Sequence, residues 1–175
     1  MTDLKKYIRS VPDFPKPGIM FRDITTLLSD PSGLQLAVDE LYAAAHGLGI
    51  TKVVGIESRG FILGGALAKK LNCGFVPVRK PGKLPAAKIS ESYVLEYGTD
   101  TIEIHADAIK PGDIVLLHDD LLATGGTARA ACNLIERLGG KIAQVSFIIE
   151  LTFIPGRGKL EMYDVRSLIQ YDSEE

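Results

Sequence analysis

Short apolar runs along the chain alternate with segments whose apolar residues recur every three or four positions. The apolar runs have the length of buried strands and cover residues 52–56, 74–78, 115–118 and 141–150. The helical spacing covers residues 31–45, 64–71 and 128–138. This alternation predicts an α/β fold, a mostly parallel sheet with helices on both faces.

The first 30 residues do not follow this alternation. A short helix is expected over residues 3–9, and prolines at 12, 15 and 17 then exclude regular structure. Ile19, Met20 and Phe21 are therefore expected to be apolar residues on a loop. Asp30 and Pro31 follow as an N-cap with proline at the first helical position, so we expect residues 1–30 to form a small hood.

Residues 80–101 are the second exception. The segment begins with prolines and basic residues and shows only weak strand alternation, through Tyr93 and Leu95. Loops of this length are uncommon unless they cover a site or bind a ligand. We expect a long flexible lid loop, the alternative being a two-stranded flap.

Composition limits the classes of protein to consider. The 175 residues fit one domain, 1–175, and the formal net charge of −2 gives no basic field for nucleic acid or an anionic membrane. Cys73 and Cys132 lie in apolar patterns without ligand spacing, which is typical of buried thiols. The N-terminus lacks the apolar run of a signal peptide and no segment could span a bilayer, so a cytoplasmic protein is expected.

Residues 115–127 are the most informative stretch. An apolar run meets Asp119 and Asp120, and small and hydroxyl-bearing residues then lead into a helical pattern. We interpret this as a strand, an acidic turn at its carboxyl end and a helix N-terminus, where backbone N–H groups bind anions. Because carboxylates accept hydrogen bonds from hydroxyls, the combination predicts a sugar-phosphate site.

Other phosphate and catalytic motifs are absent from the sequence. It contains no Gly-x-x-x-x-Gly-Lys-Ser/Thr, no Gly-x-Gly-x-x-Gly after a strand, and no serine in a nucleophile elbow. His46, His105 and His118 do not have metal-ligand spacing. A kinase or a dehydrogenase is therefore not supported.

Residues 115–127 resemble the phosphoribosyl-pyrophosphate signature of the type I phosphoribosyltransferases. Five further motifs resemble the adenine-specific members of that family, in the same order: Pro-Asp-Phe-Pro at 12–15, Phe-Arg-Asp-Ile at 21–24, Glu-Ser-Arg-Gly-Phe at 57–61, Arg-Lys-Pro-Gly-Lys-Leu-Pro at 79–85 and Leu-Glu-Tyr-Gly at 95–98. The resemblance covers nearly the whole chain and implies the family fold and the conversion of adenine and phosphoribosyl pyrophosphate into AMP and pyrophosphate. It also implies Mg²⁺ and a homodimer. His118 departs from the family's usual apolar residue, and we expect it to pack or to form a local hydrogen bond.

The resemblance implies roles for the residues of the signature. The 5′-phosphate is expected in a cradle of backbone N–H groups and hydroxyls formed by Ala123, Thr124, Gly125, Gly126 and Thr127. Asp119 and Asp120 would accept hydrogen bonds from the ribose 2′- and 3′-hydroxyls. They would also hold Mg²⁺ through water, because Mg²⁺ keeps several waters and shares carboxylates with substrate phosphates.

The other motifs are expected to handle pyrophosphate and adenine. The implied pyrophosphate residues are Glu57, Ser58, Arg59, Arg79, Lys83 and Tyr97, with Arg79 reaching across from a second subunit. Phe21 and Leu121 would sandwich adenine while backbone groups of Met20 and Arg22 read its edge, although Phe21 could equally be a core anchor. Glu96 is the candidate for proton transfer near adenine N7, the alternative being a solvated lid residue.

Two rival functions remain at this stage. The same fold could act on hypoxanthine, guanine or xanthine, since the signature identifies the phosphoribosyl donor and not the base. A phosphoribosyl-pyrophosphate-sensing regulator would need a DNA-binding module, and the sequence shows neither a basic helix nor an added domain. We therefore expect adenine and phosphoribosyl pyrophosphate as partners, with no nucleic acid and no membrane.

Overall fold

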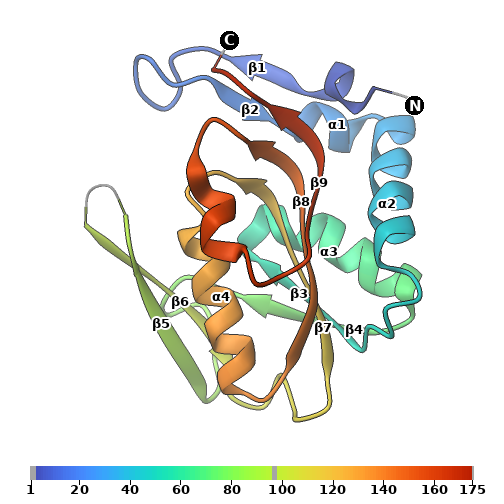
Figure 1. Ribbon diagram of the computed structural model, residues 1–175, viewed down its shortest axis with the longest axis vertical. Coiled ribbons are helices and arrows are strands. Elements are labelled where there is room, and N and C mark those ends of the chain that lie inside the picture. Colours follow the sequence, from blue (N-terminus) through green and yellow to red (C-terminus); the bar gives the residue numbers. More distant parts are fainter. Residues whose placement is uncertain (1–2, 96–97, 175) are drawn as a thin grey trace.

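The computed structural model describes residues 3–95 and 98–174 and is built around one five-stranded sheet (Figure 1). The strand order is β4-β3-β7-β8-β9, and each neighbouring pair is parallel. The strands are β3 (Lys52–Ile56), β4 (Gly74–Val78), β7 (Ile114–Leu122), β8 (Lys141–Leu151) and β9 (Val165–Tyr171). The predicted α/β fold class is confirmed.

Both faces of this sheet are covered, because successive side chains of a strand point to opposite faces. In β7, Val115 and Leu117 join a core beneath α4 (Gly126–Arg137), whereas Leu116 joins a second core. The second core lies beneath α2 (Pro31–Ala45) and α3 (Glu57–Leu71). Strands that are buried on both faces read as continuous apolar runs, which explains why these strands were visible in the sequence.

Helix α2 begins and ends where the sequence predicts. The Asp30 side chain accepts a hydrogen bond from the Gly33 N–H at 2.8 Å, and Pro31 occupies the first turn. This cap satisfies one of the backbone donors that the first turn leaves without an intrahelical partner. Helix α3 is longer than predicted, because it begins at Glu57, whereas the predicted helical spacing begins at residue 64.

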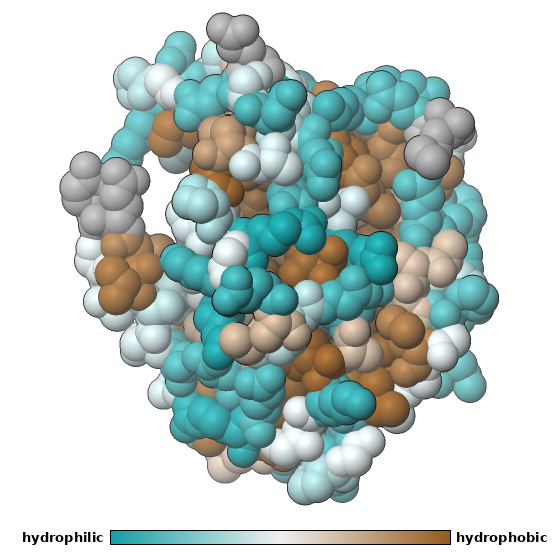
Figure 2. Space-filling model, in the orientation of Figure 1, coloured by the Kyte–Doolittle hydropathy of each residue, from teal (hydrophilic) through white to brown (hydrophobic). Residues whose placement is uncertain are grey.

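The segment predicted as a lid contains an antiparallel hairpin. Strands β5 (Lys88–Val94) and β6 (Thr99–His105) pair from Lys88↔His105 to Val94↔Thr99. The hairpin thus runs past residue 101, where the expected lid ended. Ile102 and Ile104 of β6 are fully buried in the core beneath α4, while the outer part of the hairpin projects from the body of the molecule (Figure 2). Its first strand is bound to α4, since Glu91 accepts hydrogen bonds from Asn133 Nδ2 and Arg137 Nη1, both at 3.0 Å.

The N-terminal segment lies across one end of the sheet (Figure 1). It consists of a 3₁₀ turn η1 (Leu4–Tyr7), strands β1 (Arg9–Val11) and β2 (Phe21–Asp23), and a short helix α1 (Thr25–Ser29). The helix expected over residues 3–9 is thus shorter, and Phe21 belongs to a strand where a loop was expected. Antiparallel pairing of β1 with β2 supplies backbone partners that no local pattern reveals.

Two features of the sheet also differ from expectation. Strand β7 continues through Asp119 and Asp120 to Leu122, because its pairing with β8 continues as Asp119↔Phe147 and Leu121↔Ile149. The predicted acidic turn is therefore the last part of a strand. Strand β9 was not predicted and follows a 3₁₀ turn η2 (Pro155–Leu160). Within the described ranges, no helix has the length and hydropathy needed to cross a bilayer.

Replacing Leu117 by alanine should destabilise the fold strongly. The Leu117 side chain is fully buried between β7 and α4, so Leu117→Ala removes apolar contacts and leaves a cavity. We expect the free energy of unfolding in urea to fall by about 2–5 kcal/mol. The matched variant Leu48→Ala, at a leucine that is 40% exposed, should cost less than about 1 kcal/mol. Equal losses in the two variants would contradict this account of the core.

Candidate active site

The carboxyl ends of β3 and β7 lie side by side and open into the site. The two strands are parallel and in register from Lys52↔Val115 to Gly55↔His118. Ile56 and Asp119 therefore follow at the same edge of the sheet, the edge at which α/β sheets bind ligands. Helix α3 starts directly after β3, so residues 57–59 face the acidic pair.

The two carboxylates have different surroundings. Asp120 is buried, and its Oδ2 forms an ion pair with Arg59 Nε at 3.1 Å. Asp119 is partly buried, and its Oδ1 accepts a hydrogen bond from the backbone N–H of Asp120 at 2.8 Å. Burial, together with the charge of Asp120, raises the pKa of Asp119 well above its usual value. A hydroxyl donor or a cation beside Asp119 would therefore favour its charged form.

The loop after β7 turns the backbone into the N-terminus of α4. Gly125 has φ +74°, in the left-handed region that glycine adopts readily, and α4 begins at Gly126 without a side-chain cap. The N–H groups of this first turn have no partner within the helix. Thr124 is exposed and Thr127 is partly buried beside these groups. The uncapped first turn of α4 therefore lies next to the carboxylates, where the sequence predicts an anion cradle.

A cavity of about 290 Å³ joins these features. Three parts of the chain line it at the sheet edge: the end of β3 with the start of α3, the end of β7 with the first turn of α4, and Lys80 with the end of β5. The lining residues are Ile56, Glu57, Ser58, Arg59, Lys80, Tyr93, Asp119, Asp120 and Thr127. Six of the residues singled out in the sequence therefore surround one space.

Glu57 fixes the wall opposite the carboxylate pair. Its backbone has φ +48°, a left-handed conformation that is uncommon for a residue with a side chain. Its Oε1 accepts hydrogen bonds from the backbone N–H of Lys80 and from Arg79 Nε, the latter at 3.4 Å. Glu57 thus links the start of α3 to residues 79 and 80, which lie between β4 and the hairpin.

A second cavity, of about 350 Å³, lies under the hood and is mostly apolar. Val11, Phe14, Phe21, Asp23, Ile24, Thr25 and Arg59 line it. The rings of Phe14 and Phe21 meet edge to face, with centroids 5.1 Å apart, and the Arg59 guanidinium lies 5.7 Å from the Phe21 centroid. Arg59 lines both cavities, so a planar apolar group and a charged group could bind on either side of one guanidinium.

Comparison with known proteins agrees with this geometry. The family model described as phosphoribosyl transferase domain matches residues 32–172. The chain belongs to the phosphoribosyl transferase domain family. It is 58% identical over 166 residues to the adenine phosphoribosyltransferase of Parvibaculum lavamentivorans, covering 95% of each chain.

Solved structures of the family superpose closely on this one. The adenine phosphoribosyltransferase of Rhodothermus marinus is 58% identical, with a TM-score of 0.92 and 96% of each chain covered. That of Saccharomyces cerevisiae, solved with an imino-altritol bisphosphate and adenine, is 41% identical, with a TM-score of 0.89 and 94% and 96% coverage. The family model begins after the hood, so the hood is the part of this chain that lies outside the matched phosphoribosyl transferase domain.

Some residues singled out in the sequence do not line either cavity. Lys83 is exposed, Arg79 contacts Glu57, and Leu121 packs on the core beneath α2 and α3. Met20 is partly buried at the start of β2. The Arg22 side chain donates to Ser10 Oγ and to the Glu174 carbonyl and stacks on Tyr171, so only its backbone remains for a base. Glu96 and Tyr97 lie outside the described residues.

The structure adds Lys80 and Tyr93 to the site. Lys80 Nζ forms an ion pair with Asp100, and the Tyr93 hydroxyl donates to the same carboxylate at 3.2 Å. Tyr93 and Asp100 are register partners in the hairpin. Lys80 lay within a basic segment noted in the sequence, but only the strand pairing shows which of its cations faces the cavity.

His118 forms the local hydrogen bond that was expected. It is fully buried, and its Nδ1 lies 2.9 Å from Ser146 Oγ on β8. Burial lowers the pKa of His118 to about 4, so the imidazole is neutral at physiological pH. The residue supports the strand behind Asp119 and does not face either cavity.

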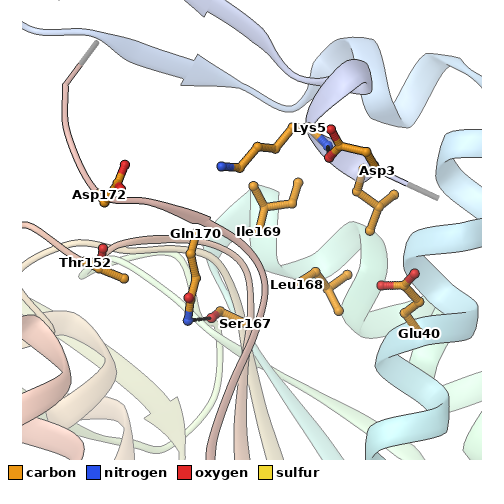
Figure 3. A pocket seen from close by; sticks show the side chains of 10 residues that line it. Asp3, Lys5, Glu40, Thr152, Ser167, Leu168, Ile169, Gln170 and Asp172 are labelled. Carbon is orange, nitrogen blue, oxygen red and sulfur yellow. Dashed lines mark hydrogen bonds between the residues drawn. The ribbon is translucent and has the colours of Figure 1, made fainter. Parts of the chain in front are cut away.

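A larger cavity lies away from this site. It has a volume of about 690 Å³ and is enclosed by η1, α2 and β9, with Lys5, Glu40 and Gln170 among its lining residues (Figure 3). Its polar side chains mostly bond to one another or face solvent, as for Gln170 Nε2 and Ser167 Oγ at 3.4 Å. Within the described ranges, no residue of the family motifs lines this larger cavity.

His118 should make the stability of the protein depend on pH. Its pKa is about 4 in the folded state and 6.5 in an exposed state, so unfolding takes up a proton between these values. The stabilisation is complete above pH 6.5 and is lost as pH falls toward 4. When pH falls from about 7.5 to about 4.5, we expect the free energy of unfolding of His118→Leu to decrease by about 2–3 kcal/mol less than that of the wild type. Identical pH profiles by urea denaturation would contradict this assignment.

Proposed function

We propose that this protein transfers the phosphoribosyl group of phosphoribosyl pyrophosphate to adenine, forming AMP and pyrophosphate in purine salvage. The observation that carries the proposal is the position of Arg59. Arg59 stands between two cavities. One, the polar cavity, is lined by the acid pair and by Thr127, and the other is apolar and lined by Phe14 and Phe21. The curated relative and the two solved structures described above bear the name of this activity.

The loop after β7 would hold the phosphoribosyl group. In this proposal the 5′-phosphate binds the N–H groups of residues 123–126 and the hydroxyls of Thr124 and Thr127. Asp119 and Asp120 accept hydrogen bonds from the ribose hydroxyls. Because these acceptors lie on a strand with both faces packed, the sugar is held against a rigid element, which favours an oriented reaction at its anomeric carbon.

The hood cavity would hold the base. Phe21 offers a ring face to a purine, and stacking on an aromatic side chain is worth about 1–3 kcal/mol per base. The backbone of Met20 and Arg22 would read the amino edge, as the resemblance implies. Leu121, which is partly buried against the core beneath α2 and α3, would form the other side of the sandwich.

Cations around the polar cavity would stabilise the departing pyrophosphate. Arg59 and Lys80 line the cavity, while Arg79 and Lys83 lie on the same basic segment as Lys80. The reaction is expected to pass through an oxocarbenium-like transition state in which pyrophosphate leaves before adenine N9 is fully bonded. Positive groups fixed near the leaving oxygen stabilise that state more than the ground state. Ser58 and Glu57, at the start of α3, line the same cavity and would complete the pyrophosphate site.

The donor set of the site fits a hydrated Mg²⁺. Two adjacent carboxylates face the polar cavity, and the raised pKa of Asp119 means that a nearby cation would favour its charged form. Within the described ranges no cluster of three or more Asp, Glu, His or Cys side chains exists to hold a metal by the protein alone. Asp119 and Asp120 would therefore hold Mg²⁺ through water together with substrate phosphates, and the ion would neutralise charge on pyrophosphate.

Glu96 and Tyr97 complete the proposal on sequence grounds. They follow the first strand of the hairpin, whose residue Tyr93 lines the polar cavity. We assign Glu96 to proton transfer near adenine N7 and Tyr97 to pyrophosphate. A lid that covers the reacting centre would exclude water, which would otherwise hydrolyse the activated sugar.

We also propose a cytoplasmic homodimer. Both cysteines are unpaired thiols, as is usual in reducing compartments. Ile62 on α3 is 50% exposed, and a second subunit packed there would cover it. Arg79 lies near the same helix, with its guanidinium 5.3 Å from the Phe61 ring centroid, a position from which it could reach a partner's pyrophosphate.

The base preference should follow the hood cavity. With phosphoribosyl pyrophosphate and Mg²⁺, the wild type should form AMP faster than it converts hypoxanthine, guanine or xanthine. Phe21→Ala should raise the KM for adenine about tenfold, because it removes a stacking surface worth about 1–3 kcal/mol. Phe153→Ala, at an exposed phenylalanine that lines neither cavity, is the control. A faster rate with a 6-oxopurine would overturn the choice of adenine.

The acid pair should act on the sugar donor. The double variant Asp119→Asn with Asp120→Asn removes two charged acceptors, each worth about 1.5–3 kcal/mol. We expect the affinity for phosphoribosyl pyrophosphate with Mg²⁺, measured by calorimetry, to fall at least about tenfold. Asp107→Asn, in an exposed turn, should leave it unchanged. Intact affinity in the double variant would reject the ribose and Mg²⁺ roles.

A further inference from the structure

The turn η2 lies directly against the loop that is proposed to hold phosphate. In Figure 1 it is the orange-red turn beside α4, and it connects β8 with β9. The contact is between backbones. A Cβ atom added to Gly156 would lie 1.9 Å from the Ala123 carbonyl oxygen and 2.9 Å from the Gly125 nitrogen.

The contact is equally close when seen from the other side. A Cβ added to Gly125 would lie 2.4 Å from the Gly156 carbonyl oxygen. Real Cβ contacts are not observed at such distances, and backbone atoms on both sides cannot turn away as a side chain can. Ala123 and Gly125 therefore keep their position only while residue 156 has no side chain.

An ion pair holds η2 in this place. Arg157 donates to both carboxylate oxygens of Glu150, from Nε at 2.7 Å and from Nη2 at 2.6 Å, and its Nη1 donates to the Val165 carbonyl at 3.1 Å. Glu150 is 3% exposed and also accepts from Ser167 Oγ at 2.6 Å. Two parallel bonds from a planar guanidinium fix orientation as well as distance.

The anchor is close to the phosphate loop in the sheet itself. Glu150 is the register partner of Leu122, the last residue of β7 before the loop. At the far end of the turn, Leu160 is fully buried in the core beneath α4. Arg157 and Leu160 thus anchor the turn at two points after Gly156.

We propose that Gly156 is a positioning residue for the phosphate loop, held against Ala123 and Gly125 by the Arg157–Glu150 ion pair. The inference rests on the proposed function, since it takes residues 123–127 as the 5′-phosphate cradle. Gly156 does not touch substrate. It sets where the cradle's N–H groups point, and a side chain at this position moves them away from the phosphate.

The chain offers a matched control for a test. Gly158 lies in the same turn, and a Cβ added there meets no atom within 4 Å. We expect Gly156→Ala to raise the KM for phosphoribosyl pyrophosphate and the inhibition constant of ribose 5-phosphate at least about tenfold. A Cβ 1.9 Å from the Ala123 carbonyl oxygen must displace the loop, and a misplacement of about 1 Å can cost about 100-fold. The KM for adenine should stay within about twofold, and Gly158→Ala should match the wild type in all three constants.

A second pair of variants keeps the test decisive if Gly156→Ala does not fold. Arg157→Met removes the anchor and leaves Gly156 in place, so it should weaken ribose 5-phosphate binding in calorimetry several-fold. Arg157→Lys keeps one of the two bonds to Glu150 and should restore part of that loss.

Two results would overturn the inference. One is an unchanged ribose 5-phosphate affinity in Gly156→Ala or Arg157→Met. The other is an equal loss of affinity for adenine and ribose 5-phosphate that follows a fall in Tm, which would indicate a structural role only. A wild type that binds ribose 5-phosphate but forms no AMP would refute the proposed function, and the calorimetry would still decide the role of Gly156.

Discussion

The parallel pairing of β3 with β7 is the constraint on which the site depends. Parallel strands end at the same edge of a sheet, and burial of both faces leaves no freedom to shift the register. A slip by one residue would send Leu116 and Leu117 to the wrong cores and move Asp119 away from the start of α3. The polar cavity therefore owes its geometry to apolar packing several residues away from it.

Charge balance is the second property that the fold imposes. Arg59 neutralises Asp120, and Lys80 neutralises Asp100, so neither cation is held without a counter-ion. Asp120 is the buried member of these pairs, and a buried carboxylate left without its partner costs several kcal/mol, on the order of the whole stability margin. The site is thus organised before any ligand arrives, which limits the entropy that binding has to remove.

The sequence predicted those parts of the structure that local rules determine. Strands 52–56 and 74–78 and helix 31–45 have their predicted bounds, since apolar runs and the Asp30-Pro31 cap act locally. The end of β7 was misjudged because Asp119 and Asp120 look like a turn, while their pairing with β8 comes from distant residues. Strand β9 was not recognised because exposed Arg166 and Gln170 interrupt its apolar pattern.

The same distinction applies to the site. The acid pair, Thr127 and Arg59 belong to contiguous motifs and line one cavity in the structure. Lys80, Tyr93 and Phe14 were missed as cavity-lining residues, because each reaches its cavity through contacts between segments far apart in the chain. Gly156 is the clearest case, since its importance comes from the absence of a side chain next to a loop about 30 residues away in sequence.

The attachment of the hairpin to α4 has a mechanical consequence. Glu91 joins β5 to Asn133 and Arg137, and the Tyr93 ring lies against Gly126, where the same helix begins. The end of β5 and the N-terminus of α4 are thus joined on one face of the sheet, whereas α3 and the hood pack on the opposite face. A displacement of the hairpin would therefore act on the first turn of α4 through Tyr93 and, at the same time, on the start of α3 through the contacts of Asp100 with Lys80 and of Lys80 with Glu57.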